Sequence, residues 1–598
     1  MEITKHTLEE QVEELAARVQ RLEFQLEQIA QQAESSRLIT PHRVVKTALE
    51  DEPVLSEEDV SEEMVSWVGQ SSLLPRLATL CFLLVIALIL RTLTDSDLVS
   101  NFIGSALGMS YSAALMIYGW HKYGKGSPLA PIFTACGAIL MGAIVVETHT
   151  HFQSLSLVPA YLTLMATGIG MALISRQFNT FIPISVGILS MCFAGAAIDY
   201  PHPYFPYLSL VLFTSNLLGY FAVQLKRCSW LRWSVLFVTM VMLQLWGYRL
   251  GSGLRQGEIP APELAVSWFL PIMTIFAATY LILSLAGIIR SGTEKLSRFD
   301  LALPTLTVLW AFSAVLYVVS AQGGNTHLLG FVGVVTAVGL LAVAFWLARR
   351  GLEGAPGANA FVFAGVALLA LILPAAIGSF VFSLPVVSAV ALFLAMKSRT
   401  WGSGAIRGTA YLFHLYCGIG LVFALFGDSP AATKGINIIP AGILAVAILS
   451  QHQWCRKWPP ATPSGFFARF DKKDHSAGLL LMTGLVCGFF MIRIILFQYL
   501  VSTAGLLPRD AFHCGQSIII NLAAIGLILL AYNRQNKELR NVAIFITVIG
   551  GTKVFLYDLL GAHGLPLVFS VFSFGMAAAV ESVVLGKWMK SSAVQKDA

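Results

Sequence analysis

Charge is what this 598-residue chain has little of, since only 12% of its residues are Asp, Glu, Lys or Arg. Soluble globular proteins carry about 25%. Apolar residues make up 56% of the chain, and so few charges cannot cover a water-facing surface of this size. The composition therefore excludes a soluble multidomain enzyme and a disordered chain, and it predicts a polytopic membrane protein.

Signals of several other protein classes are missing as well. The formal charge of +6 is spread along the chain, which gives no support to nucleic-acid binding. The eight cysteines form no C-x-x-C pair and no close group with histidines, so neither a disulfide framework nor a metal site is predicted. No Gly-rich phosphate loop, H-E-x-x-H motif or nucleophile–base pairing occurs, and we expect no catalytic residue and no cofactor. The first 70 residues are polar and acidic rather than a signal peptide, so we expect the first apolar segment to direct insertion.

Near the start of the chain, apolar residues repeat at alternating spacings of four and three: Leu8, Val12, Leu15, Val19, Leu22, Leu26 and Ile29. This heptad pattern is typical of a left-handed coiled coil, and valine at a with leucine at d favours a parallel dimer. We predict a coiled-coil helix over 1–34 that forms a homodimer; a single amphipathic helix that docks on the membrane domain or a partner is the alternative. Prolines and an acidic run follow, which predicts a flexible linker over 35–72 with a short juxtamembrane helix.

From Leu73 onward, apolar stretches long enough to span a bilayer recur with short polar breaks. We predict an all-α, polytopic transmembrane domain over 73–590 and a short tail over 591–598. The 18 predicted helices cover 74–93, 103–120, 131–147, 158–175, 180–198, 205–223, 233–248, 264–286, 302–320, 328–347, 359–377, 380–396, 408–426, 436–450, 478–500, 512–532, 541–560 and 565–586. The division between 359–377 and 380–396 is the one most open to error.

Lys and Arg concentrate in alternate loops, which is the signal that orients membrane proteins. If the N-terminal segment is cytoplasmic, the cytoplasmic loops hold 22 of these residues, Arg232 and Arg407 among them. The external loops hold five: Arg91, Arg249, Arg255, Lys434 and Arg509. Eight tryptophans lie at the predicted cytoplasmic helix ends, where amphipathic rings prefer the interface. We therefore predict that both termini are cytoplasmic.

A family resemblance rests on the segment Lys553-Val-Phe-Leu-Tyr-Asp558-Leu-Leu-Gly-Ala-His-Gly564-Leu-Pro-Leu-Val-Phe-Ser570. It resembles the C-terminal signature of a bacterial membrane-protein family, domain of unknown function 2339. The end of the first helix, the Gly-rich second helix and the N-terminal coiled coil also look like that family, so the resemblance spans about 75–590. It implies a multi-pass protein of the bacterial cytoplasmic (inner) membrane and brings no established activity. The family usually has an arginine where this chain has Leu567, so the role of that arginine does not transfer.

Ionisable residues inside hydrocarbon cost about 2.5 to 3.5 kcal/mol on insertion scales and are therefore functional candidates. Four of them fall in the outer halves or at the outer ends of predicted helices: Lys553, Asp558, Arg493 and Glu147. We predict an outward-open vestibule in which the two cations bind an anionic group, such as the phosphate of a lipid carrier, and the two carboxylates orient them. The alternative is that these side chains form structural ion pairs or snorkel to the interface.

Lys553 and Asp558 lie five residues apart, about 140° around an α-helix, so we expect each to pair with another helix. Further charges lie at the outer boundary: Arg91, Asp95, Asp97 and Asp199. His414 is the one histidine well inside a predicted helix; a transmembrane haem needs two axial ligands, so we expect none there.

Three functions compete. The leading hypothesis is a transporter or flippase of an anionic or lipid-linked cell-envelope component, because the chain combines many helices, short loops and deep charges with prolines expected to break helices. These prolines are Pro159, Pro183, Pro304, Pro374, Pro385 and Pro440. The second is a structural or assembly scaffold that dimerises through the coiled coil and recruits a cytoplasmic or envelope protein. The third is a lipid-linked-sugar glycosyltransferase, since Asp95-Ser-Asp97 resembles the acidic pair of those enzymes. Their external loops are larger, and we predict that the protein is not an enzyme.

Overall fold

The computed structural model describes residues 73–95, 99–200, 204–222, 229–291, 296–350, 355–427, 432–460, 467, 471, 474–504 and 509–594. The predicted coiled coil, the linker and Asp97 lie outside the described residues, as does the end of the tail. All regular secondary structure within the described ranges is helical.

Eighteen long helices make up this part of the chain. They are α3 (Leu73–Asp95), α4 (Asn101–Gly124), α5 (Ala130–Thr150), α6 (Leu157–Phe178), α7 (Ile182–Asp199), α8 (Phe205–Ala222), α9 (Ser229–Gln256), α10 (Val266–Ser291), α11 (Arg298–Ala321), α12 (Thr326–Ala348), α13 (Ala358–Ile377), α14 (Phe380–Thr400), α15 (Gly404–Leu425), α16 (Ile438–Lys457), α18 (Ser476–Ala504), α19 (Arg509–Arg534), α20 (Lys537–Lys553) and α22 (Leu565–Val594). Four short elements accompany them: η1 (Pro262–Leu264), η2 (Gly435–Asn437), the π-helix η3 (Val554–Asp558) and α21 (Leu559–Gly561).

These helices confirm the predicted all-α, multi-pass architecture. Seventeen are long and apolar enough to cross a membrane, and α3 adds the apolar stretch Thr79–Ile89. Each predicted span coincides with one helix, except 541–560, which α20, η3 and α21 form together, and the doubtful pair is two helices, α13 and α14. A bilayer offers backbone groups no partners, so each span satisfies its own as a helix.

The prolines do not act as expected at three positions. Pro159, Pro183 and Pro440 lie in the first turns of α6, α7 and α16. The first N–H groups of a helix have no partner within the helix, so a proline costs little there. These residues therefore begin helices, whereas Pro304, Pro374 and Pro385 lie inside them.

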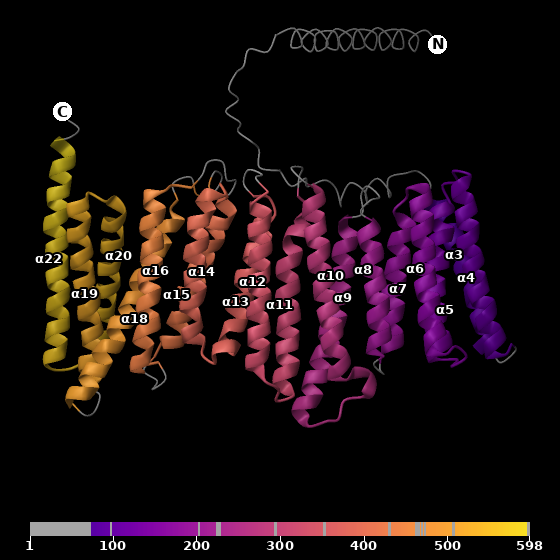
Figure 1. Cartoon of the computed structure of the whole chain (residues 1–598), viewed down its shortest axis with the longest axis horizontal. Helices are drawn as coiled ribbons and strands as arrows, with labels where there is room; N and C mark the ends of the chain where they lie inside the picture. The colour runs from indigo at the N-terminus through magenta and orange to yellow at the C-terminus, as the bar shows by residue number, and fades with distance from the viewer. Residues whose placement is uncertain are drawn as a thin grey trace, which may run out of the picture. The chain divides into compact units, whose positions relative to one another are not determined.

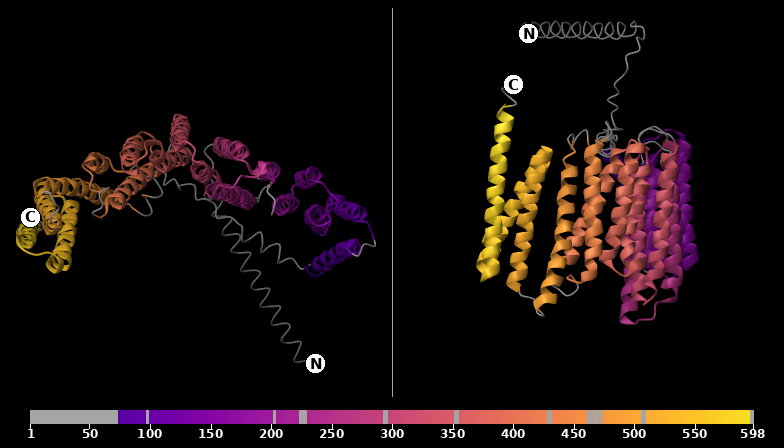
Figure 2. Two further views of the ribbon diagram at one scale, coloured as in Figure 1. Left: turned by 90° about the horizontal axis from the view of Figure 1, so that it is seen from below. Right: turned by 60° about the vertical axis from the view of Figure 1, so that its left-hand side comes forward.

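The spans stand side by side broadly in chain order, from α3 and α4 to α22, with α19 rather than α20 packed most closely on α22 (Figures 1 and 2). Every extensive helix–helix contact joins a span to one that is at most two spans away along the chain. The buried apolar residues fall into successive clusters, of which the largest is built from α10 to α18. Packing between spans is therefore mostly local, although Arg456 of α16 forms an ion pair with Glu538 of α20, three spans away.

Because the spans alternate in direction, α3 begins and α22 ends at the same end of the helices (Figure 1). We call this end the basic face, and the other the opposite face. Helix ends at the basic face carry Lys122, Arg176, Lys397, Arg399, Arg456, Lys457 and Arg534. The alternation expected from the loop charges is thus present, and the assignment of the basic face to the cytoplasm stays a prediction.

Candidate functional site

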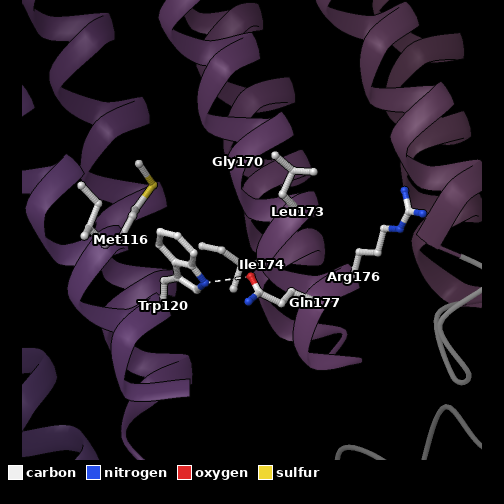
Figure 3. A pocket seen from close by; sticks show the side chains of 8 residues that line it. Met116, Trp120, Gly170, Leu173, Ile174, Arg176 and Gln177 are labelled. Carbon is white, nitrogen blue, oxygen red and sulfur yellow. Dashed lines mark hydrogen bonds between the residues drawn. The ribbon is translucent and has the colours of Figure 1, made fainter. Parts of the chain in front are cut away.

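An apolar groove lies between α4 and α6 at the basic face. Its volume is about 690 Å³, and it is lined by Met116, Ile117, Trp120, Gly170, Leu173, Ile174, Arg176 and Gln177. Trp120 Nε1 donates a 2.9 Å hydrogen bond to Gln177 Oε1, whereas Arg176 projects away from this pair (Figure 3). The lining is mostly apolar, with Arg176 as its one charged residue, so the groove offers little chemistry.

Three ion pairs among the described residues are largely buried. Arg232 Nη1 lies 3.3 Å from Asp300 Oδ1, Arg407 Nη2 lies 2.6 Å from Asp474 Oδ2, and Lys553 Nζ lies 2.9 Å from Asp558 Oδ1. The first two pairs lie near helix ends at the basic face. Lys553 is far deeper, about 24 Å along the helix from the start of α20 at a rise of 1.5 Å per residue.

Serines from two other helices complete the environment of this deep pair. Lys553 Nζ donates to the Ser517 hydroxyl of α19 at 2.7 Å and to the backbone oxygen of His513 at 2.8 Å, as well as to Asp558. All three of its hydrogens are therefore used. The second oxygen of Asp558 accepts hydrogen bonds from Ser517 and, at 2.6 Å, from Ser570 of α22. We call Lys553, Asp558, Ser517 and Ser570 the Lys553 cluster.

The prediction that Lys553 and Asp558 lie too far apart around the helix to pair was wrong. Between them the α-helix gives way to the π-helix η3, Val554–Asp558. Hydrogen bonds from i to i+5 widen the turn, so residues five apart come to the same side. The Asp558 side chain has no exposed surface, and that of Lys553 is 20% exposed.

The polar contacts continue from the Lys553 cluster toward the basic face. Asn521 of α19 donates to Ser573 Oγ of α22 at 2.8 Å, and Thr547 of α20 donates to Glu581 of α22 at 2.6 Å. A line of hydrogen bonds thus joins α19, α20 and α22 through much of their length. Sequence reasoning missed Ser517, Ser570 and Ser573, although the four-residue step from Ser517 to Asn521 places both on one face of α19.

Arg493 lies next to this cluster, but its hydrogen bonds go to the end of α15. From α18, its guanidinium donates to the backbone oxygens of Leu425, at 3.0 Å, and Gly427, at 2.7 Å. These are carbonyls at the end of α15 that the helix itself leaves without partners. The same guanidinium lies 5.3 Å from the ring centre of Phe512, the residue before His513. Arg493 and Lys553 therefore contact successive residues of α19.

Glu147 is not part of the cluster. It lies on α5 and pairs with Arg91 of α3 at 2.8 Å, beside a small cavity of about 40 Å³. The extensive contacts of α5 are with α3, α4, α6 and α7, whereas Lys553 lies on α20. Of the four predicted site residues, the structure thus brings together Lys553 and Asp558, places Arg493 beside them, and puts Glu147 in another part of the row.

The remaining boundary carboxylates have local partners or are not described in full. Asp199 ends α7, is buried, and accepts a 2.6 Å hydrogen bond from the backbone N–H of Tyr204. Asp95 is the last residue of α3, and its side chain lies outside the described part, as does all of Asp97. The acidic pair proposed for sugar transfer therefore stays a prediction.

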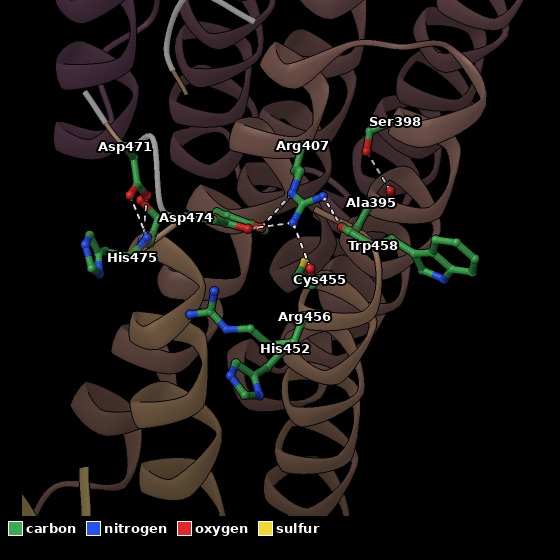
Figure 4. A network of polar contacts seen from close by, with 12 residues as sticks. Ala395, Ser398, Arg407, His452, Cys455, Arg456, Trp458, Asp471, Asp474 and His475 are labelled. Atoms are coloured by element: carbon green, nitrogen blue, oxygen red, sulfur yellow. Dashed lines mark hydrogen bonds and ion pairs between the residues drawn. The ribbon is translucent and has the colours of Figure 1, made fainter. Parts of the chain in front are cut away.

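The prediction that Arg407 and Arg232 lie in loops was wrong. Arg407 lies in the first turn of α15, is buried, and donates to Tyr411, to Asp474 and to the backbone oxygens of Cys455 and Trp458 (Figure 4). Arg232 lies in α9 and pairs with Asp300 of α11. Basic residues close to a span boundary look like loop residues in a one-dimensional charge count, which hides pairs of this kind.

Asp471 lies before α18, outside the spans. Its carboxylate accepts hydrogen bonds from the backbone N–H groups of His475, at 2.5 Å, and Ser476, at 2.7 Å. Burial raises the pKa of Asp471, but the hydrogen bonds from Ser476 and His475 outweigh it, so its pKa lies below the ordinary 3.8. Asp471 therefore caps the start of α18 in its charged form.

Within the described ranges, no three His, Cys, Asp or Glu side chains gather as a metal ion would require. No family model matches the chain, and neither does any curated protein or solved structure. The resemblance stated from the sequence stays a prediction, and function has to be argued from the side chains.

Proposed function

We propose that this protein carries an anionic, phosphate-bearing lipid or lipid-linked component of the cell envelope across the cytoplasmic membrane, as a transporter or flippase. The observation that carries the proposal is the Lys553 cluster, a buried ion pair well inside the spans. Ionisable groups at such depth are costly and commonly mark the pathways of substrates or ions. The proposal assigns no catalytic residue.

The interruption of the helix supports the same proposal. Lys553 is the last residue of α20, and the π-helix η3 and the short α21 complete the span. π-Helical turns are frequent at functional sites, and transporters commonly build their sites from broken spans. Because the π-helix already interrupts the α-helical hydrogen bonding here, the Lys553–Asp558 segment can change its backbone geometry without disrupting a continuous α-helix.

The contacts suggest how an anion would bind. Lys553 already has three acceptors, so a phosphate must replace one of them, and Asp558 is the acceptor that competes by charge. Asp558 keeps Ser517 and Ser570 as partners when it releases the lysine. In the empty site the carboxylate holds the ammonium in place by charge and hydrogen bonding, and in the loaded site the phosphate takes over that role.

Vesicles that contain the purified protein test the proposal. Fluorescent phosphatidylglycerol, polyprenyl phosphate and phosphatidylcholine are each followed by one-sided dithionite quenching. We expect protein-dependent movement of one or both phosphate-bearing anions and at least tenfold less movement of phosphatidylcholine. Lys553→Met should abolish the movement, and Lys587→Met, at an exposed position near the end of α22, should leave it unchanged.

Lys553→Met leaves a buried carboxylate without its cation, so the variant can fail to fold. The double variant Lys553→Met/Asp558→Leu removes both charges and keeps the experiment decisive. Movement at the wild-type rate in a folded double variant would overturn the role of the cluster. No movement of any probe above that in protein-free vesicles would overturn the proposed function.

A structural scaffold is the second candidate, and one observation favours it. Since the extensive contacts of each span are with near neighbours in chain order, the row leaves long surfaces that partner proteins could bind. Deletion of residues 1–35 separates the two functions: a scaffold that assembles through the predicted coiled coil loses its role in cells, whereas a transporter keeps its activity in vesicles.

A further inference from the structure

The groove between α4 and α6 contains space that a glycine leaves unfilled. Gly170 lines the groove from α6, and no atom lies within 4 Å of the position that a Cβ would take there. Gly119 of α4 is different, because a Cβ there would lie 2.5 Å from the side chain of Thr134 on α5. Gly119 thus lets two helices pack closely, whereas Gly170 leaves a space that a ligand can enter.

The walls of the groove are apolar and exposed. Ile117 of α4 is 61% exposed and Leu173 of α6 is 60% exposed, and both helices are long and apolar enough to cross a membrane. On a span, apolar surface that no protein covers contacts lipid chains. From Gly170 to Gln177 the groove extends about 10 Å along α6, at a rise of 1.5 Å per residue. It therefore runs from within the span to the end of the helix at the basic face.

The polar groups of the groove gather at its end at the basic face. There Trp120 donates its hydrogen bond to Gln177, and Arg176 lies at the rim (Figure 3). Arg176 is exposed, and no ion pair within the described ranges involves it. The last turn of α4 adds Lys122. An apolar groove with a cationic rim matches an amphiphile that has an acyl chain and an anionic headgroup, since a guanidinium binds phosphate through two parallel hydrogen bonds.

The size of the groove also favours a lipid over other occupants. Its volume of about 690 Å³ lies within the range of small-molecule sites, which are mostly apolar with a few polar groups. A partner helix would pack along a whole span, because stable protein interfaces bury about 1,000 Å² or more. Water lacks polar partners in the apolar part of the groove. Basic pockets between spans commonly bind phosphate-bearing headgroups of lipids.

We propose that this groove binds one phospholipid with an anionic headgroup, from the leaflet at the basic face. One acyl chain lies over Gly170, between Ile117 of α4 and Leu173 of α6, and the phosphate binds the guanidinium of Arg176 at the rim. The lipid is a resident ligand rather than a substrate. The inference does not depend on the proposed function, whose cluster lies on α19, α20 and α22.

Phospholipids with a diazirine in the acyl chain test the proposal. The purified full-length protein is placed in nanodiscs that contain equal amounts of photoreactive phosphatidylglycerol or photoreactive phosphatidylcholine. After irradiation, mass spectrometry measures labelling at 116–120 and 170–177. The reference is 282–289 of α10, which lies at a similar depth and includes the exposed Ile282 and Ile289.

We expect phosphatidylglycerol to label the groove about tenfold more than phosphatidylcholine does, a ratio in the range of one charge-assisted hydrogen bond. The two lipids should label 282–289 equally. Equal labelling of the groove by the two lipids would overturn the recognition of the headgroup. Labelling of the groove no stronger than that of 282–289 would overturn the site itself.

Three substitutions separate the acyl chain from the headgroup. Gly170→Trp fills the groove and should remove labelling by both lipids, whereas Gly339→Trp on α12, where a Cβ also has no neighbour within 4 Å, should leave it unchanged. Arg176→Gln should lower labelling by phosphatidylglycerol to the level of phosphatidylcholine. None of the three positions is buried, so we expect the fold to be retained. Unchanged labelling in Gly170→Trp, or an unchanged preference in Arg176→Gln, would contradict the proposal.

A protein in the groove is the competing occupant. A benzoylphenylalanine introduced at position 173 and irradiated in cells reports what contacts this wall. We expect an adduct with lipid and none with protein. An adduct with another polypeptide, whether a partner or a second copy of this chain, would overturn the proposal, as would the absence of any lipid adduct.

Discussion

At the scale of single residues, the charges of the Lys553 cluster are stabilised by a full set of partners. Asp558 accepts hydrogen bonds from Lys553, Ser517 and Ser570 and has no exposed surface. The Arg91–Glu147 pair is different, because the arginine side chain is 54% exposed. Removing one partner from a buried pair leaves an uncompensated charge, whereas an exposed pair is screened by water.

The two pairs should therefore differ in their effect on stability. We expect Asp558→Ala to lower the free energy of unfolding by about 3 to 5 kcal/mol and Arg91→Gln by less than about 1 kcal/mol. The double variant Lys553→Met/Asp558→Leu should recover much of the loss, since it leaves no unpaired charge. SDS-induced unfolding measures all three, and equal losses for Asp558→Ala and Arg91→Gln would contradict the argument.

Asp471 gives a pH dependence with a defined sign. Its pKa in the folded protein lies below the ordinary 3.8, so its carboxylate stabilises the fold above that value, and the contribution is lost as the pH falls through the folded pKa. The melting temperature of the wild type should exceed that of Asp471→Asn near neutral pH, and the difference should shrink below about pH 4. A difference that stays constant between pH 7 and pH 3 would exclude a cap that acts through its charge.

At the scale of helices, close packing depends on small residues at particular positions. At Gly484 of α18, a Cβ would lie 2.8 Å from the side chain of Leu449 on α16. The contact between α12 and α13 is closer. A Cβ on Gly330 would lie 2.5 Å from the backbone Cα of Ala376, which cannot move aside as a side chain can. Glycine lets these two backbones approach where any side chain would separate them.

A matched pair of substitutions on α12 tests this contact. Gly330→Val should destabilise the packing of α12 on α13 by about 1 to 3 kcal/mol, the usual cost of overpacking a core. Gly339→Val is the control, because no atom lies within 4 Å of a Cβ at Gly339. Thermal unfolding in nanodiscs should show a lower melting temperature for the first variant and an unchanged one for the second. Equal melting temperatures would show that the α12–α13 contact is looser than described.

At the scale of the whole molecule, alternation of the spans decides which loops share a side. Eighteen spans place the start of α3 and the end of α22 at the same face (Figure 1). The basic residues gather at that face, and Lys and Arg favour the cytoplasmic side.

Reporter fusions test this topology. A fluorescent protein that folds only in the cytoplasm should be active when fused at either end of the chain. Alkaline phosphatase, which needs the outer side, should be active in the loop between α9 and α10. Activity of the two terminal fusions on opposite sides would contradict the even number of spans.

Much of the fold could be predicted because hydrocarbon leaves a backbone few options. The 18 spans follow from runs of apolar residues, and their alternation follows from the placement of Lys and Arg. The assignment of Arg407 and Arg232 to loops was wrong because both lie in the first turn of a span. A count of charges along the chain cannot distinguish a residue one turn inside a helix from one in the adjacent loop.

Only part of the candidate site could be predicted from the sequence. Depth in a span singled out Lys553, Asp558 and Arg493 from the sequence alone. Their partners did not follow from spacing, because the π-helix at Val554–Asp558 changed which residues share a face. Glu147 was grouped with them by depth, although it lies on a helix that packs elsewhere in the row.

By itself the sequence determined that the chain forms membrane-spanning helices, how many there are, and which helix ends lie together. These properties are set by the transfer of each segment from water to lipid, which depends on local composition. Only the tertiary structure decided that Lys553 pairs with Asp558, that Arg493 caps α15, and that Trp120 contacts Gln177. Such contacts depend on how neighbouring helices pack and rotate against one another, and no local stretch of sequence encodes that.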